Sequence, residues 1–248
     1  MDDSFDRIRD LYEGGELSAA LALIKRHLVR RPDDGRVWEL AGLIQFATGE
    51  YSRSVAAIER ASVHIPLRPA ARVCLGHGYG KIGRRTLSRD LLAGLIRNES
   101  VSVPLLLQVA SGLDAIDHPS IALQACRRAA ERDPQNAQPY YDMGYYAARC
   151  GYEPRYTESL ARKAISLDPQ NVCFRVGLAA HLFRQDRVQD AYEAVRALTN
   201  EQIEAVTCSC CLNRIVSVYE AAGDYRRVVL CRQQLLQIEL QGHEPDCD

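Results

Sequence analysis

The sequence has almost no net charge. It contains 31 lysine and arginine residues and 32 aspartate and glutamate residues, which leaves a formal charge of −1 at pH 7. Proteins that bind nucleic acid by general electrostatic attraction carry a clear positive excess. We therefore expect no nucleic-acid partner, and we interpret the charges as the solvated outer faces of helices.

Lysine is also scarce, since only Lys25, Lys81 and Lys163 are present and the other 28 basic residues are arginines. A GC-rich genome would produce this bias, and so would selection for bidentate recognition of acidic groups. The sequence leaves both explanations open.

Long apolar segments are missing. The longest uncharged run, residues 100–113, includes Pro104 and four serine or glutamine residues. A membrane-spanning helix needs about 20 apolar residues. The N-terminus is acidic and no apolar stretch follows it, so we expect no secretory signal. These features predict a cytoplasmic protein without membrane contact.

Cysteine, in contrast, is common. The nine cysteines form an odd, irregularly spaced set, which favours small buried side chains over a disulfide framework. Cys208, Cys210 and Cys211 stand close enough to bind zinc or copper if further ligands joined them. No second C-x-x-C or C-x-x-H pair is present, and the nearest further candidates are Cys231, His243 and Cys247. A metal or redox site therefore remains an alternative to three small residues at the start of a packed helix.

Proline recurs at a fixed interval along the chain. Pro32 and Pro66 are 34 residues apart, Pro66 and Pro134 are 68 apart, and Pro134 and Pro169 are 35 apart. A period near 34 residues is the mark of a helical repeat protein.

Glycines fall into register at the same period. Gly42, Gly76 and Gly144 share the eighth position of the unit, and the fifteenth position is shared by Gly15, Gly49, Gly83 and Gly151. At position eight, glycine would let the first helix approach its partner closely. At position fifteen, it would end that helix by adopting a positive φ. The proline would end the second helix of the unit.

This pattern resembles the tetratricopeptide repeat family. The best copy runs from Trp38 through Gly42, Gly49-Glu50-Tyr51 and Ala61 to Pro66, and the next from Tyr140 through Gly144 and Gly151 to Pro169. The resemblance implies an all-α, right-handed α-solenoid of about seven helix-turn-helix units. The expected units are residues 1–34, 35–68, 69–102, 103–136, 137–171, 172–205 and 209–242, followed by a tail at 243–248.

Several units depart from the pattern, and two departures matter most. Unit 103–136 has Ala110 and Asp117 in place of both glycines, and its Pro119 suits the first turn of a second helix. The last helix, expected at residues 225–240, is apolar nearly all round. Terminal repeats normally keep a polar outer face. We therefore keep two interpretations of this helix. Either it packs on another copy of the chain or is covered by a partner, or it is simply a tightly folded end of the solenoid.

The family likeness also implies a concave groove lined by the first helix of each unit. Carried over by register, the expected groove residues are Phe46, His77, Lys81, Gln108, Tyr141, Tyr145, Arg149, Phe183, Arg184, Asn213 and Arg214. Aromatic and arginine side chains are enriched in interface hot spots. The expected partner is an extended or helical peptide, or a protein segment, with apolar anchors and some acidic character. Tyr141 and Tyr145 have an alternative role as packing residues between helices.

Other partners and chemistries fit less well. Family members that clamp a terminal carboxylate use lysine and asparagine at positions where this chain has Phe5 and Arg9, so we do not expect that ligand. Gly78, Gly80 and Gly83 satisfy G-x-G-x-x-G, but late in a first helix rather than after a strand. The six histidines lie in different units without a recurring partner, and we expect neither an enzyme nor a bound cofactor. The sequence favours a scaffold or adaptor of chaperone-like type, with a metal or redox sensor and a regulatory subunit of an enzyme encoded elsewhere as alternatives.

Overall fold

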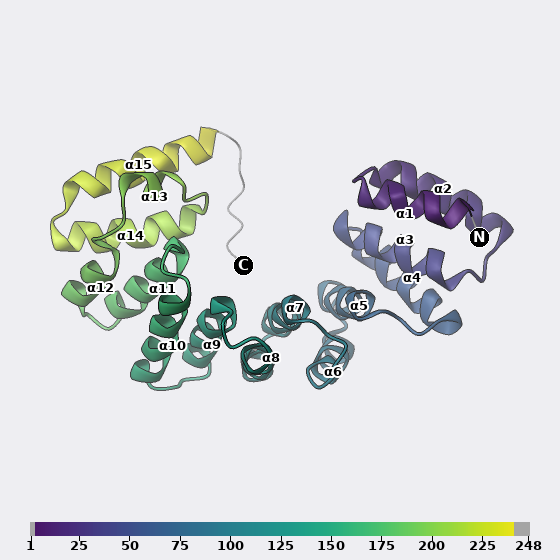
Figure 1. Cartoon of the computed structure of the whole chain (residues 1–248), viewed down its shortest axis with the longest axis horizontal. Helices are drawn as coiled ribbons and strands as arrows, with labels where there is room; N and C mark the ends of the chain where they lie inside the picture. The colour runs from purple at the N-terminus through teal and green to yellow at the C-terminus, as the bar shows by residue number, and fades with distance from the viewer. Residues whose placement is uncertain (1–2, 241–248) are drawn as a thin grey trace. The chain divides into compact units, whose positions relative to one another are not determined.

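The computed structural model describes residues 3–240. These residues form fifteen α-helices and no β-strand. The chain divides into two compact units, one ending at Ala129 and the other beginning at Ala130, so the division falls inside a helix. Consecutive helices form hairpins in each unit (Figure 1). The predicted tail, with His243 and Cys247, lies outside the described residues.

The helices have regular lengths in both units. The first unit contains α1 (Asp3–Glu13), α2 (Leu17–Arg30), α3 (Gly35–Ala47), α4 (Tyr51–His64), α5 (Pro69–Lys81), α6 (Arg85–Leu95), α7 (Val103–Ala115) and most of α8 (Pro119–Arg132). The second contains α9 (Ala137–Arg149), α10 (Pro154–Leu167), α11 (Val172–Phe183), α12 (Val188–Val195), α13 (Asn200–Glu204), α14 (Ser209–Ala222) and α15 (Tyr225–Leu240).

Each hairpin turns through one residue in the left-handed conformation. The glycines predicted for this role have φ between 75° and 82°, and Gly223 has φ 76° in the last hairpin. Asp117 and Asp186 take the same position with φ 66° and 60°, because aspartate tolerates this region better than most side chains. In all seven turns the next amide donates to the carbonyl five residues earlier, at 2.8–3.2 Å. This shared bond shows one turn geometry recurring along the chain.

Prolines follow the ends of second helices, as the sequence predicts. Helices α2, α4, α8 and α10 each end two residues before a proline. Pro119 is the first residue of α8, which confirms its predicted place. Asparagine or aspartate then caps three of the first helices, since Asp34, Asn136 and Asn171 accept backbone amides of α3, α9 and α11.

The close approach predicted at position eight holds at two glycines and fails at the third. A Cβ added to Gly42 would lie 2.3 Å from Ile58 Cγ1, and one on Gly76 would lie 2.5 Å from Leu92 Cδ2. At Gly144 the nearest atom would be the Thr157 carbonyl oxygen at 3.4 Å, an ordinary contact. The prediction is therefore wrong for Gly144, because α9 and α10 leave room where α3 and α4 do not.

An ion pair between an exposed arginine and a buried carboxylate joins α3 to the start of α5 in the first unit. Glu39 is 2% exposed, its Oε2 lies 2.5 Å from Arg68 Nε, and its Oε1 accepts the Arg68 backbone amide at 2.7 Å. Removing one partner of a buried charge leaves it poorly compensated. The pair thus fixes the passage from the second hairpin to the third.

We expect Arg68→Ala to lower the free energy of unfolding by about 1–3 kcal/mol. Urea denaturation measures this loss. The matched control is Arg84→Ala, whose partner Glu59 is an exposed carboxylate at 3.3 Å, and exposed pairs contribute about 0.2–1 kcal/mol. Equal effects of the two substitutions would contradict the role assigned to Glu39.

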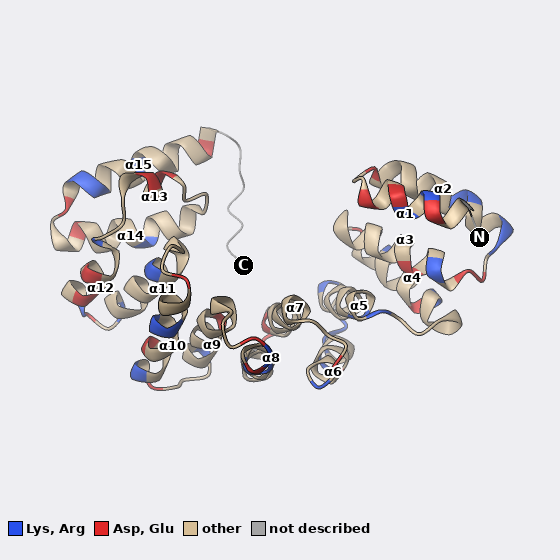
Figure 2. Cartoon of the chain, viewed as in Figure 1, with Lys and Arg blue, Asp and Glu red and all other residues tan. Residues whose placement is uncertain are grey.

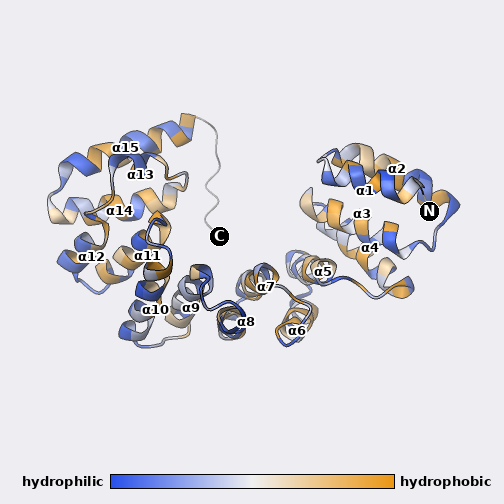
Figure 3. Ribbon diagram, in the orientation of Figure 1, coloured by the Kyte–Doolittle hydropathy of each residue, from blue (hydrophilic) through white to orange (hydrophobic). Residues whose placement is uncertain are grey.

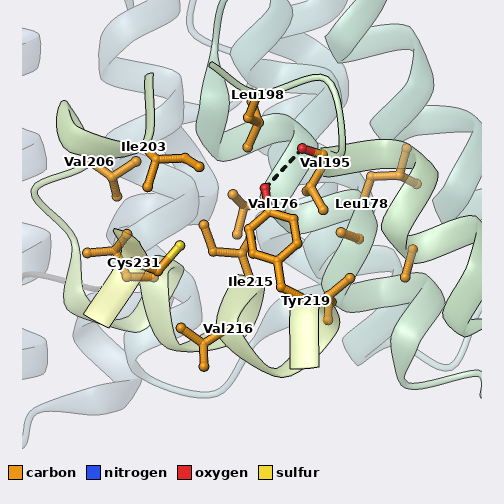
Figure 4. Packing of buried hydrophobic residues seen from close by; sticks show 14 of the residues in the cluster. Val176, Leu178, Val195, Leu198, Ile203, Val206, Ile215, Val216, Tyr219 and Cys231 are labelled. Atoms are coloured by element: carbon orange, nitrogen blue, oxygen red, sulfur yellow. Dashed lines mark hydrogen bonds between the residues drawn. The ribbon is translucent and has the colours of Figure 1, made fainter. Parts of the chain in front are cut away.

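The second unit has its own hydrophobic core, built from α10, α11, α12, α13, α14 and α15. Tyr219 lies at its centre, fully buried, and donates a 3.0 Å hydrogen bond to the Val195 carbonyl oxygen (Figure 4). Val176 and Ile215 contribute to the same cluster. Apolar and polar residues alternate along the helices of both units, as expected where one face of each helix is buried (Figure 3).

Helix α13 is an element that the sequence pattern did not separate. It lies at the end of predicted unit 172–205, just before the three-residue gap that precedes predicted unit 209–242. Thr199 and Gln202 form a capping box at its start, each side chain bonding the other's backbone amide. The box begins a new short helix, and Ile203 carries it into the core of the second unit.

Helix α15 is apolar on two sides, and only one of them is covered. Val228, Cys231 and Ile238 are buried, whereas Val229, Leu236 and Leu240 are 55%, 59% and 87% exposed. The exposed set fits the predicted self-association, which stays a prediction.

Charges of both signs are interspersed along the helices of both units (Figure 2). Across residues 3–240, every helix is too short or too polar to cross a membrane.

Candidate binding site

A pocket of about 450 Å³ opens in the second unit between α9, α10, α11 and α14. Five small residues form part of its lining, called the floor below. They are Gly144, Ala148, Ala161, Gly177 and Ala180. A volume of this size accepts one or two side chains of a peptide.

Five of the predicted groove residues line this pocket. They are Tyr141, Tyr145, Arg149, Arg184 and Arg214. Tyr141, Tyr145 and Arg149 follow one stripe of α9, because residues four apart share a helix face. Arg184 follows the last residue of α11, and Arg214 lies in the second turn of α14. The structure thus brings together, from three helices, five residues that were predicted from their register positions. Their role in binding stays a prediction.

The two tyrosines of α9 that line the pocket have different roles. Tyr145 is 53% exposed, with its ring 5.2 Å from the ring of Tyr146. Tyr141 is half-buried, lies 4.9 Å from the Phe174 ring, and occupies the space that a side chain on Gly177 would need. Burial raises the pKa of Tyr141 to about 12. Tyr141 therefore both packs between helices and forms one wall, whereas Tyr145 is available to a ligand.

Positive charge dominates the pocket. Its lining holds three arginines and no aspartate or glutamate. Within residues 3–240, neither Arg184 nor Arg214 forms an ion pair with another side chain. Arginine presents a planar set of donors that matches a carboxylate. The pocket can therefore take an acidic group beside an apolar one.

The remaining lining residues were not assigned to the site by the sequence analysis. They are His181, Thr157, Tyr152, Pro154 and Gln185. His181 Nε2 lies 2.7 Å from Thr157 Oγ1 and 3.2 Å from the Pro154 carbonyl oxygen. They fall outside the register positions that the family likeness assigns to a groove. The signal that was available is that His181 and Arg184 are three residues apart and so share a helix face.

Two predicted groove residues of this unit lie elsewhere. Phe183 packs against the hydrophobic core of the unit and does not line the pocket. Asn213 is exposed on α14, next to Arg214 but outside the lining. Phe183 is apolar, and it is better shielded from water against the core than it would be in the pocket.

The predicted residues of the first unit form a separate set of contacts. The Phe46 ring lies 6.1 Å from the His77 ring, and His77 Nε2 lies 2.7 Å from the Gln108 carbonyl oxygen. Lys81 Nζ stands 5.9 Å from the centre of the Tyr51 ring. Burial lowers the pKa of His77, so its neutral form is favoured. His77 thus packs α5 against α7, and the exposed members are Lys81 and the Gln108 side chain.

A hydrogen-bonded row of three side chains lies near the N-terminus, formed by Ser4, His27 and Asp34. Ser4 Oγ lies 3.1 Å from His27 Nδ1, and His27 Nε2 lies 3.0 Å from Asp34 Oδ2. The same order of groups occurs in hydrolases. Here the other oxygen of Asp34 caps α3 by accepting the amides of Arg36 and Val37. We assign the group a structural role, because it holds α1 and α2 against the start of α3.

Three cysteines cluster at the start of α14 in the second unit, and Cys173 interacts with one of them. Cys208, Cys210 and Cys211 keep their sulfur atoms within 4.8 Å of one another. Cys173, near the start of α11, forms a hydrogen bond with Cys211. The bond stabilises the Cys173 thiolate and lowers its pKa, while the pKa of Cys211 is raised. Cys173 is a member that the sequence spacing did not indicate.

Asp142, beside Tyr141, is a half-buried carboxyl group. Burial raises its pKa from 3.8 to about 6, and a 2.7 Å hydrogen bond from Gln138 Nε2 to Oδ1 offsets part of the rise. The folded state therefore binds a proton between pH 4 and 6 that the unfolded chain has released. Stability falls as pH rises through this window, so the ionised carboxylate destabilises the fold at pH 7.

We expect Asp142→Asn to raise the free energy of unfolding at pH 7, by at most about 2–3 kcal/mol at 1.36 kcal/mol per pKa unit. The gain should shrink to about half a kcal/mol near pH 4, where Asp142 is protonated in the folded state and about half protonated in the unfolded chain. Thermal denaturation of both proteins at pH 4, 5.5 and 7 checks this, and a gain independent of pH would contradict the raised pKa.

Known proteins of one kind resemble this chain. Residues 5–70 match the family model described as tetratricopeptide repeat. A tetratricopeptide repeat protein from Parabacteroides merdae aligns with a TM-score of 0.70 at 13% identity, over 96% of this chain and 92% of that one. The C-terminal part of a repeat-containing protein from Cytophaga hutchinsonii aligns with a TM-score of 0.66 at 12% identity, over 94% and 95%.

YrrB, described as a TPR protein with an unusual peptide-binding site, aligns with a TM-score of 0.57 at 19% identity, over 67% of this chain and 85% of that one. No curated protein matches the sequence. Together with the helical hairpins, these likenesses confirm the predicted all-α solenoid fold, and residues 5–70 carry the tetratricopeptide repeat.

Proposed function

We propose that this protein is an interaction scaffold that binds an acidic peptide or protein segment in the pocket of its second unit. The observation that carries the proposal is the lining itself, which joins three arginines and exposed tyrosines over a floor of small residues. Surfaces of this composition are typical of interface hot spots.

The shape of the pocket suggests how such a ligand would lie. The small residues of the floor, Gly144, Ala148 and Ala180 among them, leave space for an apolar anchor of the ligand. Tyr145 and Tyr152, 53% and 45% exposed, offer rigid apolar faces at low entropic cost. Arg184 and Arg214 would pair with carboxylates that flank the anchor.

The fold supports a binding role for the protein as a whole. Its likeness to tetratricopeptide repeat proteins fits an interaction scaffold, and the peptide-binding site described for YrrB offers a parallel on the same fold. The proposal goes further than the likeness, because it assigns the ligand's charge and names the pocket from this chain's own residues.

Selection from a peptide display library tests the proposal. We expect the selected peptides to combine an aromatic or large aliphatic residue with two or more acidic residues, since the pocket pairs an apolar floor with cationic walls. Their affinity, measured by fluorescence anisotropy, should fall as salt is raised, because the charged groups are exposed. Selection of basic peptides, or affinity indifferent to salt, would contradict the assignment.

A further inference from the structure

A glycine of α11 and a tyrosine of α9 pack tightly against each other at the binding pocket. Gly177 and Tyr141 both line this pocket. A Cβ added to Gly177 would stand 2.4 Å from the Tyr141 hydroxyl oxygen and 2.5 Å from Cε2 of the same ring. Since non-bonded carbon atoms are best separated by about 3.5–4.0 Å, any other residue at position 177 would displace the ring.

The Tyr141 ring has buried side chains on its other side. It lies 4.9 Å from the Phe174 ring, centroid to centroid, and packs against the cluster that Phe174 forms with Ala137 and Ala164. Phe174 is only 2% exposed, so it cannot yield without opening this cluster. A methyl group on Gly177 would therefore drive the hydroxyl end of the ring away from α11 and into the pocket.

The second glycine of the floor has no such contact. A Cβ on Gly144 would lie 3.4 Å or more from its neighbours, and Tyr141 is not among them. Position 177 is thus the place in the floor where a single methyl group would change the space above it.

Three rings and three guanidinium groups form the walls around this space. They belong to Tyr141, Tyr145, Tyr152, Arg149, Arg184 and Arg214. Aromatic rings attract one another beyond the area that they bury, and the guanidinium plane stacks on aromatic faces. An aliphatic side chain gains neither of these contacts, so the walls favour an aromatic one.

We propose that the pocket takes an aromatic side chain of the acidic peptide as its anchor, and that Gly177 is the positioning residue that keeps the Tyr141 ring out of the anchor's place. This inference rests on the proposed function, because the anchor belongs to the peptide that binds there. It adds the chemical kind of the anchor and the residue that sets the space for it.

A double-mutant cycle on the full chain tests the contact between Gly177 and Tyr141 without any ligand. Gly177→Ala should lower the melting temperature by several degrees, because the methyl group overpacks the ring. In the Tyr141→Ala background the same change should be neutral or stabilising, since alanine favours a helix over glycine.

Gly94→Ala is the matched control for this cycle. Gly94 lies in α6, and a Cβ there would meet no atom within 4 Å. The control should not lower the melting temperature. Equal effects of Gly177→Ala with and without the Tyr141 ring would overturn the role assigned to Gly177.

Peptides that differ only at the anchor test the preference of the pocket. They are derived from one selected acidic peptide and carry phenylalanine, leucine or alanine at that position. The natural chain should bind the phenylalanine peptide about 3–10-fold more tightly than the leucine peptide, the range that ring stacking gives. Gly177→Ala should weaken binding of the phenylalanine peptide by at least about 10-fold and leave that of the alanine peptide nearly unchanged, as measured by fluorescence anisotropy.

Removal of the displaced ring separates this effect from a general disturbance of α11. Gly177→Ala combined with Tyr141→Ala should bind the phenylalanine peptide more tightly than Gly177→Ala alone. Equal losses for all three anchors, no gain from removing the ring, or leucine bound as tightly as phenylalanine would overturn the inference and leave the proposed function standing. If the natural chain bound no acidic peptide, the proposed function would fail and the anchor with it.

Discussion

Replacing both Arg184 and Arg214 with glutamate is expected to abolish high-affinity binding of acidic peptides. The double change turns two attractive contacts into repulsive ones beside the same floor. Truncating one member of a hydrogen-bonded charge pair that the bound ligand buries costs about 2–5 kcal/mol. Even the lower figure, applied to the pair of changes together, gives a loss of about 30-fold, and we expect 100-fold or more.

Fluorescence anisotropy with a selected peptide measures this loss. Arg26→Glu with Arg30→Glu is the matched control, because both arginines are exposed on α2 of the first unit and neither lines the pocket. The control should bind almost normally, which separates local contacts from a change in net charge. If the two double variants lose affinity equally, the pocket is not the binding site.

Alanine at Gly42 is expected to destabilise the protein, although alanine favours helices over glycine by about 0.5–1 kcal/mol. The added Cβ would lie 2.3 Å from Ile58 Cγ1, and Ile58 is fully buried. Helices α3 and α4 would have to separate or Ile58 would have to leave its rotamer. Overpacking of this kind costs about 1–3 kcal/mol or more.

Alanine at Gly144 should have the opposite sign. Its Cβ would lie 3.4 Å or more from its neighbours, so only the gain in helix propensity remains, about 0.5–1 kcal/mol. Thermal denaturation of the two variants compares equivalent positions in two repeats. Stabilisation by Gly42→Ala, or a large loss with Gly144→Ala, would contradict the hairpin packing described above.

The repeat could be predicted from sequence because the residues at its turns and helix ends have strict backbone requirements. A positive φ at each hairpin turn selects glycine, and a proline after each second helix cannot continue it. These residues fixed the phase even where others were missing, as in the hairpin that turns through Asp117. The short helix α13 escaped because its signal, Thr199 with Gln202, is a local cap outside the period.

The pocket was only partly predictable, for a different reason. Register indicates which residues of a first helix face one side, so it found Tyr145 and Arg184. It does not indicate how far neighbouring helices separate, and that distance decides whether Phe183 packs in the core and whether Gly144 borders a cavity. Cys173 was missed similarly, since its neighbours are set by the packing of α11 on α14.

Amide hydrogen exchange of the full chain with and without a selected acidic peptide tests the central claim most directly. We predict slower exchange at the ends of α9 and α11 and in the first half of α14, with the first unit unchanged. Protection confined to the first unit, around Phe46 and Lys81, or absent from all three helices, would contradict the assignment of the pocket as the binding site.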